Sequence, residues 1–220
     1  MAVTLISTEN VTFTAVDNPP GVSVTVPADC EAVYMFWAYN TAAGQQTLTA
    51  TLDGNALDAS FSITYQASAL SGGVGVFYSP STGTITLDPA WTNAVSNSGR
   101  VVILAYVKGG TTTWRDADGD SDTATTAVSV TIDSSSTDLV MKFDYRYDAS
   151  ETPGGTSTGW TSQATFGNND CAARLSTADS PGASTTVCDC EDEFYSGVVA
   201  VSVVDAGGPV PPFINVAVTG

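Results

Sequence analysis

Hydrophobic and polar residues alternate along most of this chain, but three short segments are apolar at nearly every position. Alternation predicts a β-strand with one buried face, whereas a continuous apolar run predicts a strand that is buried on both faces. Residues 32–39, 100–108 and 197–204 are such runs, and we predict that they form three central strands. In the first run the two faces would carry different sets: Val33, Met35, Trp37 and Tyr39 on one, and Ala32, Tyr34, Phe36 and Ala38 on the other.

The alternating segments predict further strands, each with one wet face. Asp53-Gly54 favours a tight hairpin turn because both residues tolerate a positive φ angle. Residues 138–147 alternate most regularly, and they predict a strand with a charged, solvated outer face. The alternation places Leu139, Met141, Phe143, Tyr145 and Tyr147 inward and Lys142, Asp144, Arg146 and Asp148 outward. The other predicted strands are 3–7, 11–15, 22–26, 47–52, 61–65, 74–78, 84–88, 123–132, 163–166, 172–175, 185–188 and 213–218.

Three segments depart from the strand pattern. Pro89 suits a first helical turn, so residues 88–99 are predicted to form a short helix or a crossover loop. The Ser- and Gly-rich residues 66–73 and 149–162 are predicted loops. The predicted strands follow one another about every 8 to 12 residues, a spacing that is typical of a β-sandwich. We predict an all-β, two-sheet antiparallel jelly-roll sandwich over residues 1–206, with a short C-terminal extension, residues 207–220, made of a proline-rich linker and a last strand.

The charge balance narrows the classes of partner. The chain has 23 acidic residues against six basic ones, a net charge of -17. Binding to a phosphate backbone requires clustered Lys and Arg, so we expect no nucleic-acid partner. Binding to an anionic membrane surface is disfavoured for the same reason, and no apolar run is long enough to span a bilayer. Residues 1–13 lack the basic and apolar regions of a secretory signal, so we expect either that a signal has been removed or that the protein assembles inside the cell.

The absence of histidine narrows the chemistry. It excludes Ser-His-Asp and Cys-His catalysis as well as metal sites built on histidine. Glycoside hydrolysis needs only two carboxylates, and Asp189, Glu191 and Glu193 would share one face of an extended strand. The residues between them, Cys190 and Asp192, are not the apolar spacers of such enzyme motifs. We therefore expect an acidic, solvated turn and a protein that is not an enzyme.

Residues 116–122, DADGDSD, are the candidate metal site. Calcium takes six to eight oxygen ligands, and a loop that bends at Gly119 could gather carboxylates around one ion. The EF-hand pattern also requires a Glu at its twelfth position, which is Ala127 here. Two interpretations stay open, a calcium loop and a solvated acidic loop without a cofactor. The candidate ligands are Asp116, Asp118, Asp120 and Asp122.

The cysteine residues and the tryptophan residues can each be interpreted in two ways. Cys171 could pair with Cys188 or Cys190 and close a loop, or the four cysteines could be free, partly buried thiols. A four-cysteine zinc site is disfavoured because no C-x-x-C pair is present. The tryptophans that lie in or beside predicted loops could form a platform for a sugar, or they could pack against the end of the sandwich. These are Trp91, Trp114 and Trp160.

The order of the segments resembles a concanavalin-like jelly-roll module of the kind seen in bacteriophage virion proteins and bacterial surface proteins. The resemblance covers roughly residues 8–206. Its segments are AVYMFWAY, TLTATLDGNALDAS, GVGVFYSPSTGTITLDP, RVVILAYV, AVSVTIDSSSTDLVMKFDY and GVVAVSVVDA. The resemblance implies a non-enzymatic virion structural protein, a capsid decoration or head-fibre component that is made in the host cytoplasm and assembled on the virion surface. The alternative is a carbohydrate-binding adhesion module of a phage tail or a bacterial surface.

The C-terminal extension is the candidate interface. A proline-rich linker followed by a lone strand predicts a tail that packs back on its own domain or adds to the sheet edge of a neighbouring subunit. We expect a homo-oligomer whose partners are the major capsid protein or other virion proteins. The candidate interface residues are Pro209, Pro211, Pro212, Phe213, Ile214, Val216 and Val218.

Overall fold

The strands of this protein form several stacked layers. The computed structural model describes residues 2–13, 20–40, 48–64, 70–91, 100–109, 112–122, 128–146, 158–168, 171–182, 185–190, 196–205 and 216–219. These residues contain strands and turns but no helix, so the predicted all-β class is confirmed. Within the described residues the strands form four sheets, which we name A to D.

Each sheet has a simple strand order. Apart from one parallel pair, β6 and β17, neighbouring strands are antiparallel. Sheet A contains, in order, β1 (Thr4–Val11), β9 (Arg100–Lys108), β3 (Ala32–Asn40), β7 (Leu70–Tyr78), β6 (Ala59–Thr64) and β17 (Val216–Thr219). Sheet B contains β2 (Val22–Val26), β8 (Gly83–Trp91), β4 (Leu48–Leu52) and β5 (Asn55–Ala56). Sheet C contains β10 (Thr112–Asp122), β16 (Ser196–Asp205), β12 (Leu139–Arg146), β14 (Cys171–Ala178) and β13 (Trp160–Asn168), and sheet D contains β11 (Val128–Asp133) and β15 (Thr185–Cys190).

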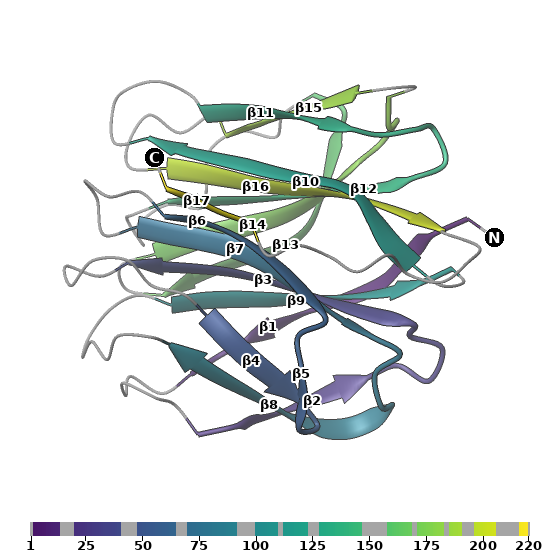
Figure 1. The fold of residues 1–220 in the computed structure, drawn as a ribbon, viewed down its shortest axis with the longest axis vertical. Helices are drawn as coiled ribbons and strands as arrows, with labels where there is room; N and C mark the ends of the chain where they lie inside the picture. Colours follow the sequence, from purple (N-terminus) through teal and green to yellow (C-terminus); the bar gives the residue numbers. More distant parts are fainter. Residues whose placement is uncertain are drawn as a thin grey trace.

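The sheets stack in the order B, A, C, D, from the bottom to the top of Figure 1. The antiparallel sandwich predicted from the sequence is present as sheets A and C, and the structure adds sheets B and D outside them. Sheet A is therefore covered on both faces. Sheet C is covered on one face by sheet A and on part of the other by sheet D.

Strand β3 shows why this stack forms. Tyr34 and Phe36 point into the core between sheets A and C, where Phe36 stacks on Phe143 with ring centroids 5.7 Å apart. Met35 and Trp37 point the opposite way, into the core between sheets A and B. The predicted division of residues 32–39 into two apolar faces is thus confirmed, and each face has its own core. Strand β9 is divided in the same way.

Glycines allow strands where the sequence predicted a loop. Residues 66–73 were expected to form a Ser- and Gly-rich loop, but β7 already begins at Leu70. A Cβ atom on Gly72 would collide with the ring of Tyr145, and one on Gly73 would lie 2.6 Å from Cε2 of Trp37. The aromatic rings of neighbouring strands therefore fill the space that β7 leaves empty, which offsets the low strand propensity of glycine.

Other boundaries also differ from the sequence predictions. Residues 11–15 were predicted as a separate strand, but Val11 ends the continuous strand β1. The expected helix or crossover loop at 88–99 is strand up to Trp91, and residues 92–99 lie outside the described part of the chain. Pro89 sits in β8 opposite Ala50. The long strand β10 replaces a segment that was predicted to be a polar loop.

We predict that Gly119→Ala destabilises the protein by about 1–3 kcal/mol through overpacking. Gly119 lies on the inner face of β10, where an added Cβ would collide with Cδ1 of Ile63 and lie 2.8 Å from the backbone oxygen of Val198. Urea unfolding measures the change. The double variant Gly119→Ala, Ile63→Val should recover part of the loss, because it removes the Cδ1 atom. A fully stable single variant would contradict this account of the sheet spacing.

Candidate functional site

The C-terminal strand β17 occupies one edge of sheet A. It runs parallel to β6, with Val216 opposite Phe61 and Thr219 opposite Thr64. The backbones of Val216 and Val218 thus lie on the sheet edge of the same chain, one of the two arrangements predicted for the tail. The candidate interface residues Pro209, Pro211, Pro212, Phe213 and Ile214 lie outside the described residues. Figure 1 shows β17 beside β6, at the edge of sheet A.

The acidic segment 116–122 is part of strand β10 and not a loop. Because alternate residues of a strand share a face, its aspartates lie along the outer face of sheet C instead of surrounding one point. Two of these carboxylates bind the neighbouring backbone: Asp118 accepts from the N–H of Gly119 and Asp120 from that of Ser121, both at 2.8 Å. Asp116 accepts from the N–H of Asp133 in β11 at 2.7 Å.

This geometry differs from the loop that both interpretations of residues 116–122 assumed. Gly119 does not bend the chain; it lets β10 approach Ile63 of sheet A. Among the described residues no three His, Cys, Asp or Glu side chains are grouped so that they could hold a metal ion. The side chain of Asp122, the fourth candidate ligand, lies outside the described part of the structure. The described carboxylates of β10 instead accept hydrogen bonds from backbone N–H groups on the outer face of sheet C.

The three candidate tryptophans belong to three different cores. Trp91 is 4% exposed and packs against Trp37 and Tyr39 between sheets A and B. Trp114 stacks on Tyr34 at the core between sheets A and C. Trp160 packs at the core between sheets C and D. These tryptophans therefore do not share a surface on which a sugar could stack.

Cys171 and Cys188 lie in different layers. Cys171 is fully buried in the core between sheets A and C. The backbone of Cys188 belongs to β15, which pairs with β11 on the opposite face of sheet C. A disulfide between them would have to reach across sheet C. Cys30 is buried as a free thiol in the core between sheets A and B, and this burial raises its pKa to about 11.

The outer face of β12 is buried, contrary to the prediction of a charged, solvated face. Lys142, Asp144 and Arg146 are at most 8% exposed. The side chain of Asp144 forms ion pairs with Lys142 at 3.5 Å and with Arg174 of β14 at 3.9 Å. The ammonium group of Lys142 also lies 4.9 Å from the ring centroid of Trp160. Sequence alternation identified the polar face, but it could not show that other parts of the chain cover it.

Asp144→Asn should lower the free energy of unfolding by about 3–5 kcal/mol, because it removes the anion between two buried cations. Urea unfolding monitored by fluorescence gives the value. The matched control is Asp29→Asn, since Asp29 pairs with Lys108 at 2.7 Å but both side chains are about half exposed. The control should change stability much less. Equal effects of the two substitutions would show that the charges on β12 are solvated.

Asp138 is the centre of a second buried polar cluster. Its side chain is fully buried and receives a bidentate ion pair from Arg115, with Nε 2.6 Å from Oδ2 and Nη2 3.2 Å from Oδ1. The backbone N–H and hydroxyl of Ser135 and the hydroxyl of Ser202 also donate to it, each at 2.9 Å. Burial alone would raise the pKa of Asp138, but these donors outweigh it and hold the pKa below 3.8. The cluster fixes the turn before β12 against β16.

Because the folded state lowers the pKa of Asp138, its stabilising effect is complete above the unfolded pKa and is lost as the pH falls through the folded value. The difference in unfolding free energy between the wild type and Asp138→Asn should therefore be constant from about pH 7 to 5 and shrink below about pH 4. Urea unfolding at a series of pH values measures it. Substitution of the exposed Asp88 serves as the control. A difference that persists unchanged at the lowest pH would contradict the prediction.

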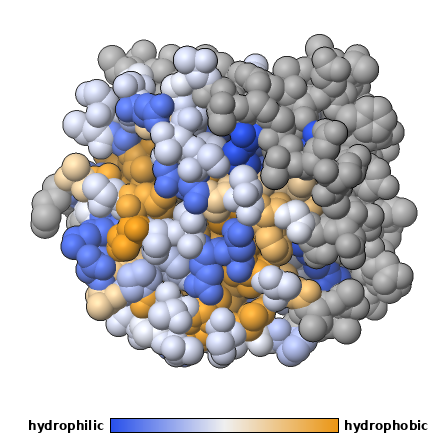
Figure 2. Space-filling view, turned by 180° about the vertical axis from the view of Figure 1, so that it is seen from behind, coloured by the Kyte–Doolittle hydropathy of each residue, from blue (hydrophilic) through white to orange (hydrophobic). Residues whose placement is uncertain are grey.

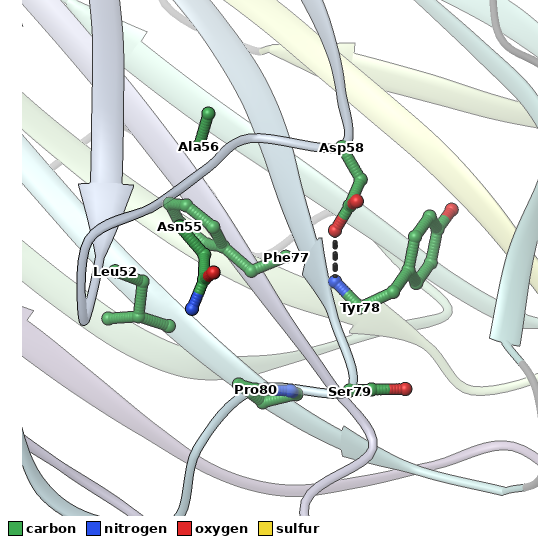
Figure 3. A pocket seen from close by; sticks show the side chains of 8 residues that line it. All are labelled: Leu52, Asn55, Ala56, Asp58, Phe77, Tyr78, Ser79 and Pro80. Atoms are coloured by element: carbon green, nitrogen blue, oxygen red, sulfur yellow. Dashed lines mark hydrogen bonds between the residues drawn. The ribbon is translucent and has the colours of Figure 1, made fainter.

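A small pocket lies where the β4–β5 turn meets the end of β7. Its volume is about 200 Å³, and Asn55, Asp58, Phe77, Ser79 and Pro80 are among the residues that line it. Figure 3 shows the amide of Asn55 pointing into the space between Phe77 and Pro80. One oxygen of Asp58 accepts the N–H of Tyr78 at 2.7 Å. The sequence predicts the Asp53-Gly54 turn but not this pocket, because the lining residues come from two separate segments, 52–58 and 77–80.

The other acidic candidates, the search for a membrane-spanning helix and the comparisons with known proteins complete the description of the site. The acidic residues Glu191 and Glu193 lie outside the described residues, and Asp189 is part of β15. In the described part of the chain no helix has the length and apolar character to cross a bilayer. Comparison with family models, curated proteins and solved structures finds no match.

Proposed function

We propose that this protein is a non-enzymatic structural component of a virion surface, a capsid decoration or head-fibre protein. In this proposal it is made in the host cytoplasm and joins the particle as a homo-oligomer, with the major capsid protein or other virion proteins as partners. The resemblance of its segments to jelly-roll modules supports the setting. The position of the C-terminal strand β17 supports the mode of assembly.

Strand β17 is an added edge strand. It is four residues long, and in the described chain its only sheet partner is β6. The ten residues 206–215 connect it to the end of β16, and a segment of that length can span at most about 33–36 Å. In the proposed oligomer, this connection lets the same strand add to the β6 edge of an adjacent subunit. Exchange of a terminal strand is a known way for one chain to complete the sheet of another.

The opposite edges of sheets A and C are closed by side chains of β1. The side chain of Asn10 donates to the carbonyl of Thr165 in β13 at 2.9 Å, and the hydroxyl of Thr8 donates to that of Gln163 at 3.3 Å. These bonds occupy carbonyl groups that an edge strand would otherwise offer to another chain. On the face behind the view of Figure 1, the described apolar surface is broken up by polar side chains (Figure 2). The β6 edge is therefore the best-supported point of assembly.

The stacked sheets suit a mechanical role. Residues of β3, β9 and β12 that face the cores are almost completely buried, so three cores hold the four sheets together. The net charge of -17 would keep separate copies soluble and make nonspecific association unfavourable. Specific strand pairing can overcome that repulsion where a charged surface cannot.

Deletion of residues 209–220 is expected to abolish oligomer formation while the sandwich stays folded. The oligomer should be a defined species, with a trimer as the expected form, and the deletion variant should have the mass of one chain. Native mass spectrometry measures the mass, and circular dichroism measures the fold.

The matched variant keeps the chain length but replaces residues 216–219 with Gly-Ser-Gly-Ser. Because glycine and serine are poor strand formers, it should behave as the deletion does. If the deletion variant still assembles, or if the full-length protein is a monomer at all concentrations, the proposed mode of assembly is wrong.

A further inference from the structure

Strand β10 forms one edge of sheet C, where a further strand could add. Within the described residues it pairs only with β16, and it is eleven residues long. An antiparallel strand with a single neighbour directs alternate N–H and carbonyl groups away from its sheet. A long edge of this kind is a template for pairing with another chain, both in aggregation and in strand exchange.

Two N–H groups of β10 are already occupied by side chains of the same strand. The N–H of Gly119 donates to Oδ1 of Asp118, and that of Ser121 donates to Oδ1 of Asp120, both at 2.8 Å. Because Gly119 and Ser121 are two residues apart, their N–H groups point to the same side of the strand. Each bond takes up a donor that the edge would otherwise offer to a carbonyl of an added strand.

A third aspartate caps the edge of the neighbouring layer. Oδ2 of Asp116 accepts the N–H of Asp133 at 2.7 Å. Asp133 is the last residue of β11, and in the described chain β11 is paired only with β15, so it too is an edge strand. The same kind of bond thus recurs on a second sheet. The alternate spacing of residues 116, 118 and 120 follows, because side chains two residues apart share one face of a strand.

A carboxylate serves this purpose better than a neutral acceptor does. Hydrogen bonds to an ionised acceptor are roughly twice as strong as those between neutral groups. The charge also repels an approaching copy of a chain whose net charge is -17. Asp120 is exposed and Asp118 partly exposed, so both carboxylates can meet an incoming strand.

We propose that Asp116, Asp118 and Asp120 block the β10 and β11 edges against strand addition by a second copy of this chain. The acidic segment thereby acts as a guard of sheet edges, a role that differs from both the metal loop and the solvated loop. It restricts strand addition to edges that lack such caps. The inference rests on the hydrogen bonds of β10, and it depends neither on the partner of β17 nor on a virion setting.

The double variant Asp118→Val, Asp120→Val of the full-length protein tests the proposal. Valine favours strands but accepts no hydrogen bond, so the N–H groups of Gly119 and Ser121 become available to another chain. Sedimentation velocity over a series of concentrations measures association. At equal concentration, the fraction in species larger than those of the wild type should increase by about tenfold or more.

Two controls separate the lost acceptor from the lost charge and from the added apolar surface. Asp118→Asn, Asp120→Asn removes the same two charges but keeps an oxygen acceptor at each position, so its large species should stay within about twofold of the wild type. Asp88→Val places valine on the exposed face of β8, a strand paired on both sides, and it should also stay within about twofold.

The single variant Asp120→Val keeps the test decisive if the double variant fails to fold. It changes one exposed side chain and frees one N–H group, so it should increase the large species by a smaller factor. The proposal is overturned if the folded valine variants have the mass distribution of the wild type, or if the asparagine variant associates as strongly as the valine variant. Neither result changes the mass expected for the wild type or for the deletion of residues 209–220.

Discussion

Burial of both faces of sheet A is the constraint on which the rest of this structure depends. Strands β3 and β9 are apolar at nearly every position, so one covering layer could satisfy only half of their side chains. Sheet C covers the side that carries Tyr34 and Phe36, and sheet B covers the side that carries Met35 and Trp37. The hydrophobic area that would otherwise face water provides the main driving force for adding layers to a simple sandwich.

The outer face of sheet C is more polar than sheet A, and it buries charged side chains. The outer face of sheet C combines the apolar contacts of sheet D with the buried charges of Lys142, Asp144 and Arg174. Buried ion pairs add little net stability, because their desolvation offsets their attraction, but removal of one partner is costly. Such groups favour one arrangement of the layers over others. Asp138 accepts five hydrogen bonds, from Arg115, Ser135 and Ser202, and it fixes the turn into β12 by the same physics.

Sequence patterns predicted local structure better than they predicted the neighbours of each strand. The bounds of β2 and β9 and the two faces of residues 32–39 followed from hydrophobic periodicity, which is a property of the strand itself. The strand at 112–122 was missed because its inner face is small, with Gly119 against Ile63, and lacks the apolar signal. The burial of Lys142 and the pocket at Asn55 depend on distant segments, and no local pattern reports them.

In the proposed function, a rigid stack of sheets assembles through one edge, where strand β17 can pair with β6 of another subunit. Hydrogen–deuterium exchange of the full-length protein, at concentrations below and above assembly, tests that combination most directly. The amides of β3 and β9 should exchange slowest in both states, since both strands lie inside sheet A. Because β17 already pairs with β6 in a single chain, exchange of the strand between subunits keeps these hydrogen bonds, and protection at residues 59–64 and 216–219 should be the same below and above assembly. Added protection at any other strand on assembly would contradict assembly through this edge, as would amides of residues 216–219 that exchange without protection in both states.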